Sequence, residues 1–317
     1  MFLNTTFVYM KGIVIKSTGK NYLVKLDNGI VFESILKGKF RIAGIKSTNP
    51  VVVGDKVEIS KIKEKWVITE LYTRKNYILR KSVNLSKQTH IIAANIDQAI
   101  LMITLASPFT TTSFIDRFLV AANAYDVDVI LLFNKMDIID DDAKKELELR
   151  KIYYQKIGYK CLKMSIVKDS MSDIKKIIKG KVNMIAGHSG VGKSTLINKL
   201  QPNLNILTQP ISVVHNQGQH TTTFSQLYDL EFGGSIIDTP GIKGFGLVSI
   251  EKNNIGNYFK EFFNLKSKCK FNNCIHKDEP NCAVKIALKE GEILESRYKN
   301  YLSMLNDDDD DFFRKKD

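Results

Sequence analysis

The sequence predicts a multidomain fold in which a small N-terminal β-barrel precedes a central three-layer α/β domain and a mostly helical C-terminal region. Three observations support this prediction. Short β-rich segments fill residues 7–72, strand and helix patterns alternate after residue 90, and three cysteines and one histidine cluster within residues 269–282. The chain has 317 residues, 44% of them hydrophobic, which is enough for two or three domains with cores of their own.

The N-terminal segment, residues 1–73, has the strand pattern of a small barrel. Asp27-Asn28-Gly29 separates two β-rich stretches, and an Asn-Gly pair favours the tight turn of a hairpin. Five short strands in so few residues indicate an OB-fold, the small barrel that commonly binds nucleic acid, so we expect an RNA-binding domain. The expected strands are Phe7–Lys16, Asn21–Leu26, Ile30–Leu36, Val51–Ile59 and Lys65–Leu71.

After a basic, polar segment that we interpret as a linker, residues 74–90, the pattern changes to that of an α/β domain over residues 91–246. Continuous apolar runs such as Ala99–Leu105 are typical of strands covered on both faces, as in a parallel sheet with helices on each side. The other expected strands and helices are Val129–Phe133, Lys181–Ala186, Ser235–Ile237, Ser113–Tyr125 and Ser194–Leu200.

A phosphate-binding loop stands between an expected strand and an expected helix. The residues Gly187-His188-Ser189-Gly190-Val191-Gly192-Lys193-Ser194 fit the pattern GxxxxGK[ST], and Thr195 follows. Glycines let backbone amides approach phosphates, the helix N-terminus favours an anion, Lys193 reaches the β and γ phosphates, and Ser194 can ligate Mg²⁺. The alternative is a glycine turn that matches by chance. The loop predicts a nucleotide site without identifying the base.

A base-reading motif, Asn134-Lys135-Met136-Asp137, follows the apolar strand Val129–Phe133. The aspartate can accept hydrogen bonds from the N1–H and 2-amino groups of guanine, which adenine does not offer. The lysine stem can pack along the base, and the asparagine can tie neighbouring loops together. These four residues are otherwise an ordinary polar loop, but ligands of parallel α/β sheets bind at the ends of strands, which favours guanine recognition.

The motif Asp238-Thr239-Pro240-Gly241 follows the expected strand Ser235–Ile237. A strand-end aspartate can hold the magnesium shell while the glycine amide senses a γ-phosphate. The preceding loop contains Thr221, Thr222 and Thr223, of which we take Thr222 as the candidate magnesium ligand. A plain polar turn is the alternative.

The C-terminal region, residues 247–306, contains a cluster of metal ligands. Its four members are Cys269, Cys274, His276 and Cys282. Three thiolates and an imidazole so close together match a closed, tetrahedral, structural zinc site of a reducing compartment, whereas unligated buried cysteines are the alternative. A helix is expected over Ala283–Leu305, Cys161 is interpreted as core, and residues 307–317 form an acidic tail that we expect to be disordered.

The formal net charge is +13, and the acidic residues of the tail offset part of the positive charge of the remaining chain. A polyanion such as nucleic acid would be attracted to such a protein, although solubility alone is the other interpretation. Lys37, Lys39, Arg41 and Lys46 crowd one connection of the barrel and either bind phosphates or merely solvate a loop. The absence of a long apolar run or signal peptide predicts a cytoplasmic protein that does not use a membrane.

Taken in chain order, these motifs resemble the circularly permuted GTPases, because NKMD precedes GHSGVGKS and DTPG. With a barrel before them and CKFNNCIHKDEPNC after them, residues 5–302 are similar to the ribosome small-subunit-dependent GTPase A (RsgA/YjeQ) family. The resemblance implies an OB-fold, a permuted Ras-like P-loop GTPase domain and a zinc-binding domain. It departs from the usual Ser-Ala base contact at Ser165-Ile166.

The resemblance further implies a monomeric GTPase that binds GTP or GDP with Mg²⁺, contains one structural Zn²⁺, and contacts the 30S ribosomal subunit and 16S rRNA late in maturation. The glutamine that orients water in Ras-like enzymes is replaced by Ile242, so we expect slow intrinsic hydrolysis. His220 is the candidate catalytic substitute. We also hypothesise that Gly241–Val248 passes a γ-phosphate-dependent shift to the zinc domain.

Two alternatives compete with a ribosome-biogenesis GTPase. One is an RNA-binding module that holds nucleotide as a structural ligand, and the other is a P-loop ATPase or kinase. The complete magnesium set of Ser194, the threonines and Asp238 disfavours the former, and the guanine motif that ends at Asp137 disfavours the latter.

Overall fold

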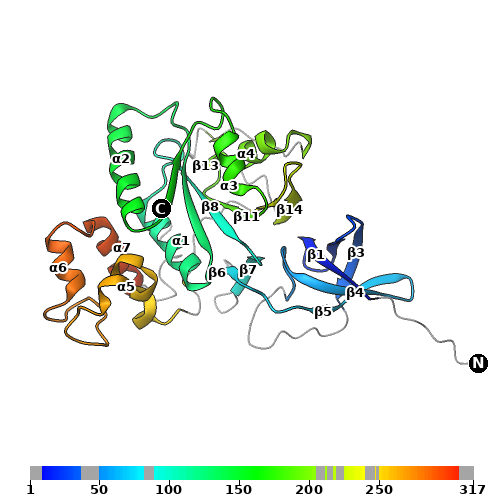
Figure 1. The fold of residues 1–317 in the computed structure, drawn as a ribbon, viewed down its shortest axis with the longest axis horizontal. Coiled ribbons are helices and arrows are strands. Elements are labelled where there is room, and N and C mark those ends of the chain that lie inside the picture. The colour runs from blue at the N-terminus through cyan, green and yellow to red at the C-terminus, as the bar shows by residue number, and fades with distance from the viewer. Residues whose placement is uncertain are drawn as a thin grey trace, which may run out of the picture.

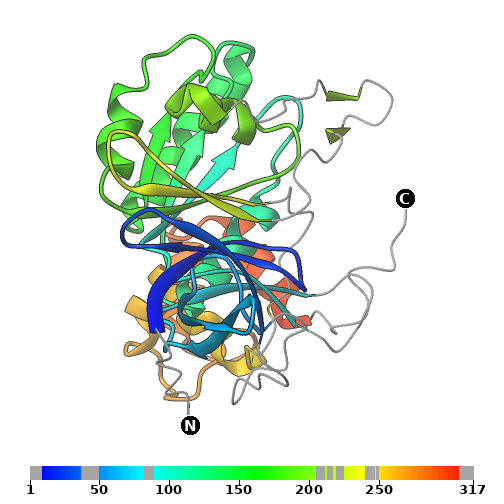
Figure 2. The same cartoon turned by 90° about the vertical axis from the view of Figure 1, so that its right-hand side faces the viewer.

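The computed structural model describes residues 9–36, 50–81, 89–204, 211–212, 217–218, 225–239, 247 and 250–306. The barrel and the C-terminal helices lie on opposite sides of the α/β domain (Figure 1). Turned by 90°, the barrel stands in front of the C-terminal helices (Figure 2). None of the helices within these ranges is long and apolar enough to cross a membrane. The basic cluster Lys37–Lys46 and the tail 307–317 lie outside the described residues.

The N-terminal strands form a closed five-stranded barrel, as predicted. The strand order is β1-β2-β3-β5-β4, and an additional β1–β4 pairing closes it. The β3–β5 pair is parallel and the other pairs are antiparallel. Alternate residues such as Val14, Val24, Ile59 and Ile68 fill the interior. The strands are β1 (Tyr9–Ser17), β2 (Tyr22–Leu26), β3 (Val31–Leu36), β4 (Lys56–Ile62) and β5 (Lys65–Leu71).

Two features of the barrel test the predicted turn and the predicted start of the fourth strand. The β2–β3 hairpin forms at the predicted turn, where the Gly29 amide donates to the Leu26 carbonyl over 2.9 Å. The prediction that the fourth strand begins at Val51 was wrong, since β4 begins at Lys56. Val51, Val52 and Val53 are buried instead in the connection before β4. Val51 packs in the barrel core, and Val52 and Val53 pack with hydrophobic residues between Ile78 and Ala94.

The central domain contains a sheet of order β10-β9-β8-β11-β15-β14, in which only β14 is antiparallel to its neighbour. Alternate residues of β8 face opposite layers. Leu101 joins a core with α1 (Thr112–Ala124) and α2 (Asp141–Lys156), and Met102 joins a core with α3 (Ser172–Ile178) and α4 (Lys193–Leu200). The predicted three-layer arrangement is confirmed. The strands are β8 (Gln98–Ile103), β9 (Asp128–Phe133), β10 (Lys160–Lys163), β11 (Val182–Ala186), β14 (Gln226–Asp229) and β15 (Ser235–Asp238).

The helices of this domain match the predicted positions to within a residue where a prediction was made. They are α1 (Thr112–Ala124), α2 (Asp141–Lys156), α3 (Ser172–Ile178) and α4 (Lys193–Leu200). Short elements follow α4, namely the 3₁₀ helix η1 (Pro202–Leu204) and the paired strands β12 (Ile211–Ser212) and β13 (Gln217–Gly218).

The segment expected to be a linker, residues 74–90, contains strand β6 (Tyr77–Lys81), which pairs with β7 (Thr89–Ala94). Barrel and sheet are also joined by one β1–β14 pairing and by an ion pair of 2.5 Å between Lys25 and Asp229. A second, buried ion pair joins Arg74 to Asp55 over 2.7 Å. The β1–β14 pairing and the Lys25–Asp229 ion pair therefore attach the barrel to the α/β domain, while the Arg74–Asp55 pair attaches the segment after β5 to the barrel.

The C-terminal region packs on α1 and consists of η2 (Lys252–Tyr258), α5 (Lys260–Lys266), α6 (Ala283–Lys289) and α7 (Glu295–Asn306). The single helix predicted over Ala283–Leu305 was wrong, because a turn at residues 290–294 separates α6 from α7. Val120 of α1 shares one hydrophobic core with Ile255, Phe259 and Phe262.

Gly54 offers a test of the junction between barrel and sheet. Its φ is +91°, and a Cβ there would lie 2.0 Å from the carbonyl oxygen of Ala94. We predict that Gly54→Ala lowers the free energy of unfolding by roughly 3 kcal/mol, because strain and a backbone clash add. Gly29→Ala is the matched control, since its φ is +84° and nothing lies within 4 Å of the added Cβ. Gly29→Ala should lower the free energy of unfolding, measured in urea, by only about 1–2 kcal/mol. Equal losses in the two variants would contradict the close packing of Gly54 against Ala94.

Candidate nucleotide-binding site and metal centre

The predicted nucleotide motifs meet at one edge of the sheet. The strands β8, β9, β10, β11 and β15 are parallel, so their carboxyl ends point the same way. Asn134 follows β9, Ser165 follows β10, Gly187 follows β11 and Thr239 follows β15. This edge is where ligands bind in open α/β sheets, and the chain order of the strands does not affect it.

The phosphate-binding loop has the local conformation that its glycines predict. Gly192 precedes α4 with φ +105°, and a Cβ at this position would lie 2.7 Å from Nδ2 of Asn134. Only glycine therefore allows the loop and the Asn134 side chain to approach this closely. Ser194 and Thr195 lie in the first turn of α4, half-buried.

Lys193 is buried beneath the loop that it follows. Its ammonium donates to the carbonyl of Gly187 over 3.0 Å and to that of His188 over 2.8 Å. Burial lowers the pKa of Lys193 to about 8, and the nearby charge of Asp238 opposes part of that shift. An anion bound in the loop would stabilise the charged form of this lysine.

The Asn134 side chain connects three loops of the site. Its Nδ2 donates to the carbonyl of Val191 in the phosphate-binding loop over 2.8 Å. Its Oδ1 accepts from the amide of Ile166 in the loop after β10 over 3.1 Å. Asn134 is buried, so both hydrogen bonds are shielded from water. The expectation that this asparagine ties loops together is met by these two contacts.

Asp137 is held by a contact that the sequence did not reveal. The hydroxyl of Ser165 donates to Oδ1 of Asp137 over 2.6 Å, and this bond lowers the pKa of Asp137. The Ser165 amide donates to the carboxylate of Asp169 over 2.7 Å. The amides of Ser165 and Ile166, the pair that departs from the usual Ser-Ala motif, thus both donate to side chains of this protein.

The residues between Asn134 and Asp137 serve the loop in different ways. Lys135 adopts a left-handed conformation with φ +65°, and its ammonium donates to the carbonyl of Ser107 over 2.5 Å. Burial lowers the pKa of Lys135. Met136 packs against the core beneath α1 and α2. Ser107 lies before α1, and its contribution could not be found from any motif.

Asp238 is buried at the end of β15, and its charge acts on Lys193 across the site. The hydroxyl of the next residue, Thr239, donates to the carbonyl of Ile185 on β11 over 2.7 Å, which fixes the start of this loop. The remaining predicted site residues, Gly241, Thr222 and His220, lie outside the described residues, as do Ile242 and most of Gly241–Val248.

The ring of His188 in the phosphate-binding loop packs against the ring of Phe114 of α1 in a tilted arrangement. The ring centroids lie 3.8 Å apart at an interplanar angle of 31°. Helix α1 is capped at this end by Thr111, whose hydroxyl accepts from the Phe114 amide over 3.2 Å. The first turn of α1 thus supports the loop from outside the motif, and sequence spacing had not indicated it.

The four predicted zinc ligands come together in the C-terminal region. Their ligand atoms all lie within 4.8 Å of one another. Nδ1 of His276 lies 3.4 Å from Sγ of Cys274, 3.4 Å from Sγ of Cys282 and 3.7 Å from Sγ of Cys269. Tetrahedral zinc, with Zn–S of about 2.3 Å and Zn–N of about 2.0–2.1 Å, places sulfur and nitrogen about 3.5 Å apart. The donor set therefore fits one zinc ion.

The loops that carry the zinc ligands are fixed by hydrogen bonds from neighbouring residues. Tyr298 donates to the carbonyl of His276 over 2.7 Å, and Tyr301 donates to that of Ile275. Glu279 accepts from the amides of Ile275 and Lys277 over 2.6 and 2.8 Å. Burial raises the pKa of Cys274 to about 12, so its thiolate requires a cation such as zinc for stabilisation.

Replacing one ligand tests the metal centre. We predict that Cys274→Ala reduces bound zinc from about one ion per chain to a small fraction and lowers the melting temperature, because metal binding contributes folding free energy. Elemental analysis and thermal unfolding measure both effects. Cys161→Ala is the control, since Cys161 is also buried but lies on β10 and outside the cluster. Full zinc content in the Cys274 variant would contradict the assignment.

Comparison with known families agrees with this architecture. Residues 71–248 match the family model described as RsgA GTPase, and residues 11–66 match the one described as RsgA N-terminal domain. A Flavobacterium psychrophilum protein named small ribosomal subunit biogenesis GTPase RsgA is 54% identical over 308 residues, 96% of this chain and 94% of that protein. A Bacteroides fragilis protein of the same name is 52% identical over 307 residues, 96% of this chain and 99% of that protein.

Solved structures show the same similarity. The crystal structure of YjeQ from Thermotoga maritima aligns with a TM-score of 0.74 at 34% identity, covering 94% of this chain and 98% of that one. The structure of YloQ, described as a circularly permuted GTPase, aligns with a TM-score of 0.70 at 29% identity and covers 96% of each chain.

Proposed function

The chain belongs to the RsgA GTPase family, and on this premise we propose that it hydrolyses GTP to GDP and phosphate while it acts in the biogenesis of the small ribosomal subunit. The observation that carries the proposal is the joining of three loops by Asn134, beside an Asp137 carboxylate polarised by Ser165. Such a carboxylate has the acceptors that guanine requires, and the phosphate-binding loop stands next to it.

The described motif residues take the following roles in the proposed GTP site. Asp137 accepts from the guanine base, Lys135 packs along it, and the amides from Gly187 to Thr195 surround the phosphates. Lys193 exchanges the carbonyls of Gly187 and His188 for β and γ phosphate oxygens, which keeps the buried ammonium paired. Ser189, Gly190 and Val191 complete the phosphate-binding loop between His188 and Gly192.

Ser194 and Asp238 are proposed to hold Mg²⁺ with the nucleotide, and Thr222 and Gly241 are proposed to complete the site from the loops around them. Mg²⁺ supplies neutralisation of phosphate charge when it is bound. His220 is the proposed residue that orients the attacking water, because Ile242 has no polar atom for this task. Hydrolysis by the isolated protein is therefore slow, and docking on the 30S subunit accelerates it.

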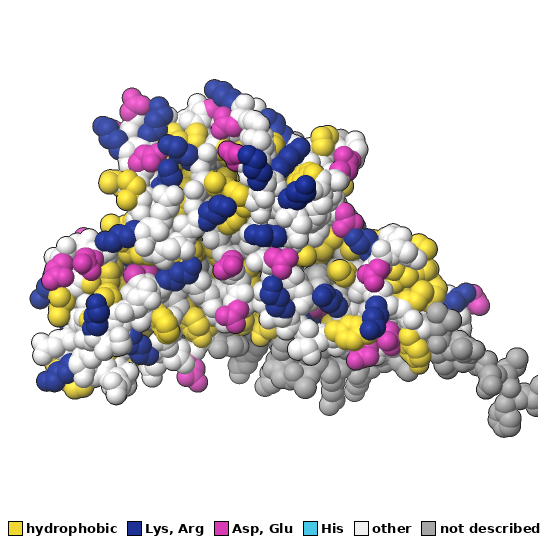
Figure 3. Space-filling view, viewed as in Figure 1, with side chains coloured by type: hydrophobic (Ala, Val, Ile, Leu, Met, Phe, Trp, Pro, Cys, Tyr) yellow, Lys and Arg dark blue, Asp and Glu magenta, His cyan; other side chains and the backbone are white. Residues whose placement is uncertain are grey.

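The barrel and the zinc region are the proposed contacts with 16S rRNA. The barrel has the closed OB-type strand order, and the zinc site is closed, with a structural rather than catalytic ligand set. On the face in Figure 3, Lys and Arg side chains are spread over the barrel, the central domain and the helical region. Asp and Glu side chains lie among them on this face, so the positive charge is distributed over the three regions rather than gathered in one patch. A monomer binding the subunit is the simplest form of this proposal.

The competing functions have less support. A P-loop ATPase or kinase would not need a carboxylate at Asp137, held by Ser165, to read a base. An RNA-binding module with nucleotide as a structural ligand would not need Asp238 beside Lys193 at the phosphate loop.

Phosphate release with and without purified 30S subunits tests the proposed activity. We expect slow release by the protein alone and an increase of at least about tenfold with 30S subunits, since completion of a site in trans accelerates related NTPases strongly. His220→Ala should remove most of that increase while GDP affinity stays unchanged. Absence of GTP hydrolysis in both conditions would contradict the enzyme, and an unchanged His220 variant would contradict only the role of that histidine.

Base specificity can be tested separately. We predict that Asp137→Asn weakens GDP binding by at least about a hundredfold and improves binding of xanthosine diphosphate, because the amide can donate to the second carbonyl of xanthine. Calorimetric titration with both nucleotides measures the change. Asp128→Asn is the matched control, because Asp128 is exposed at the opposite end of β9. Retained preference for GDP in the Asp137 variant would contradict guanine recognition by this residue.

A further inference from the structure

We propose that Arg297 is a positioning residue for the phosphate-binding loop. It fixes helix α1 to the zinc region, and α1 in turn supports His188, so that the seating of the zinc region on α1 sets the affinity for guanine nucleotide. This inference rests on the proposed nucleotide site. It adds a role for a residue that lies outside every nucleotide and zinc motif of the chain.

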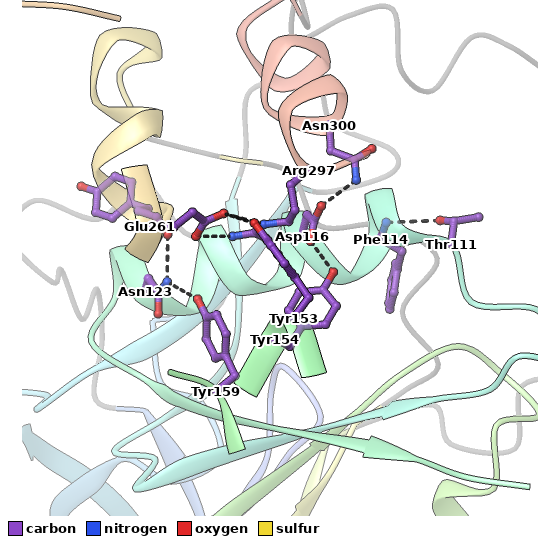
Figure 4. Close-up of polar contacts among 11 residues, drawn as sticks. Thr111, Phe114, Asp116, Asn123, Tyr153, Tyr154, Tyr159, Glu261, Arg297 and Asn300 are labelled. Carbon is purple, nitrogen blue, oxygen red and sulfur yellow. Dashed lines mark hydrogen bonds and ion pairs between the residues drawn. The ribbon is translucent and has the colours of Figure 1, made fainter. Parts of the chain in front are cut away.

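Arg297 lies at the centre of a buried ionic network between α1 and the C-terminal helices (Figure 4). Its Nη1 donates to Oδ1 of Asp116 on α1 over 2.7 Å. Its Nε and Nη2 donate to the two carboxylate oxygens of Glu261 on α5 over 2.8 and 3.0 Å. One guanidinium thus joins two carboxylates that come from different domains.

The network leaves little freedom for α1 and α7 to shift against one another. Tyr154 donates to Oδ1 of Asp116 over 2.6 Å, and Asn300 of α7 donates to Oδ2 over 2.6 Å. The guanidinium carbon lies 4.4 Å from the ring centroid of Phe259. Buried charges must keep their partners, since separation leaves an uncompensated charge in a dry environment. The two helices therefore have one strongly preferred arrangement.

The same helix α7 holds the zinc loop. Residues next to Arg297 and Asn300 in sequence, Tyr298 and Tyr301, donate to the carbonyls of His276 and Ile275. Gly256 of η2 packs against the ring of His276, where an added Cβ would lie 3.3 Å from Cδ2. The metal loop and the Asp116 contact are consequently attached to one rigid element.

The opposite side of α1 holds the nucleotide loop. Phe114 and Asp116 are two residues apart, so they project in nearly opposite directions from the helix, as Figure 4 shows. Asp116 meets Arg297, while Phe114 packs against His188 of the phosphate-binding loop. The loop before α1 also supplies the Ser107 carbonyl to Lys135. A shift of the start of α1 would therefore disturb both the phosphate and the base contacts.

The far end of α1 is fixed as well. Nδ2 of Asn123 donates to the Tyr159 hydroxyl over 2.7 Å and to the Tyr258 carbonyl of η2 over 2.8 Å. With both ends held, α1 moves with the zinc region rather than bending away from it. Reciprocity requires that a change of seating which alters nucleotide affinity by a given factor is itself shifted by bound nucleotide by the same factor.

The experiment compares zinc-loaded full-length protein with the variants Arg297→Lys, Phe114→Leu and Lys299→Gln. A lysine retains the charge but lacks the fork that reaches both carboxylates. Lys299 is the matched control, because it is an exposed cation on the same helix that pairs with Glu295. Zinc content and urea unfolding confirm that each variant is folded.

Two measurements are made on each protein: the dissociation constant for GDP, and the imidazole NMR signals of the five histidines. The Phe114→Leu variant identifies His188, because that ring loses its aromatic neighbour. We expect Arg297→Lys to move the same signal and to raise the GDP dissociation constant about fivefold or more. The double variant with Phe114→Leu should weaken binding by less than the product of the two single effects, as expected for coupled residues. Lys299→Gln should change neither measurement.

A purely structural Arg297 would lower the free energy of unfolding but leave the His188 signal in place and the GDP dissociation constant within about twofold, and this result would overturn the proposal. If Arg297→Lys does not fold, Asn300→Ala takes its place, because it removes one α7 contact to Asp116 without stranding a charge. Asn300→Ala should move the His188 signal and raise the GDP dissociation constant, as expected for Arg297→Lys. If neither measurement changed, the inference would again be overturned. If the wild type fails to bind GDP, the proposed nucleotide function fails, while the His188 signal still tests the contact.

Discussion

The site depends on the hydrogen bonds of one buried side chain, Asn134. Its amide nitrogen donates to the phosphate-binding loop at Val191, and its oxygen accepts from Ile166 in the loop after β10. These loops are brought together because five parallel strands end at one edge of the sheet. The requirement is spatial, so the order of the strands along the chain is free to vary. NKMD can therefore precede GHSGVGKS without any loss of the site.

The permuted order places different neighbours beside the nucleotide. The strand β14 follows the loop with the candidate threonines and pairs directly with β1 of the barrel. Beyond Asp238 the chain leads to η2, which packs on α1. Both flanking regions are thus attached close to the nucleotide site. This arrangement suits an enzyme whose nucleotide site is coupled to a large binding partner. A structural change in either flanking region can reach the nucleotide site through few intervening residues.

The junction between α1 and the zinc region uses buried ion pairs rather than apolar contact alone. Asp116 and Glu261 pair there with Arg297, while Asp55 and Arg74 form a buried pair between the barrel and the segment that follows it. Such pairs add little net stability compared with apolar packing, but a misplaced arrangement would leave charge unpaired. They are therefore best understood as contacts that select one orientation of the domains. Helix α1 also connects the Arg297 network to the phosphate-binding loop, through the contact of Phe114 with His188.

Features that depend on neighbouring residues could be predicted from the sequence alone. The Asn-Gly turn, the glycine loop, NKMD, DTPG and the cysteine–histidine cluster are short, and each has a chemistry that its spacing reveals. The distant residues that support these motifs became visible only in the folded structure. Asp116 and Arg297 are 181 positions apart, and in sequence each resembles an ordinary charged position of a helix. Ser165, Ser107 and Phe114 likewise gain their roles from packing, and the hairpin of β6 and β7 was hidden in a basic segment. Local patterns record backbone preference and ligand chemistry, whereas burial and pairing arise only when remote segments meet.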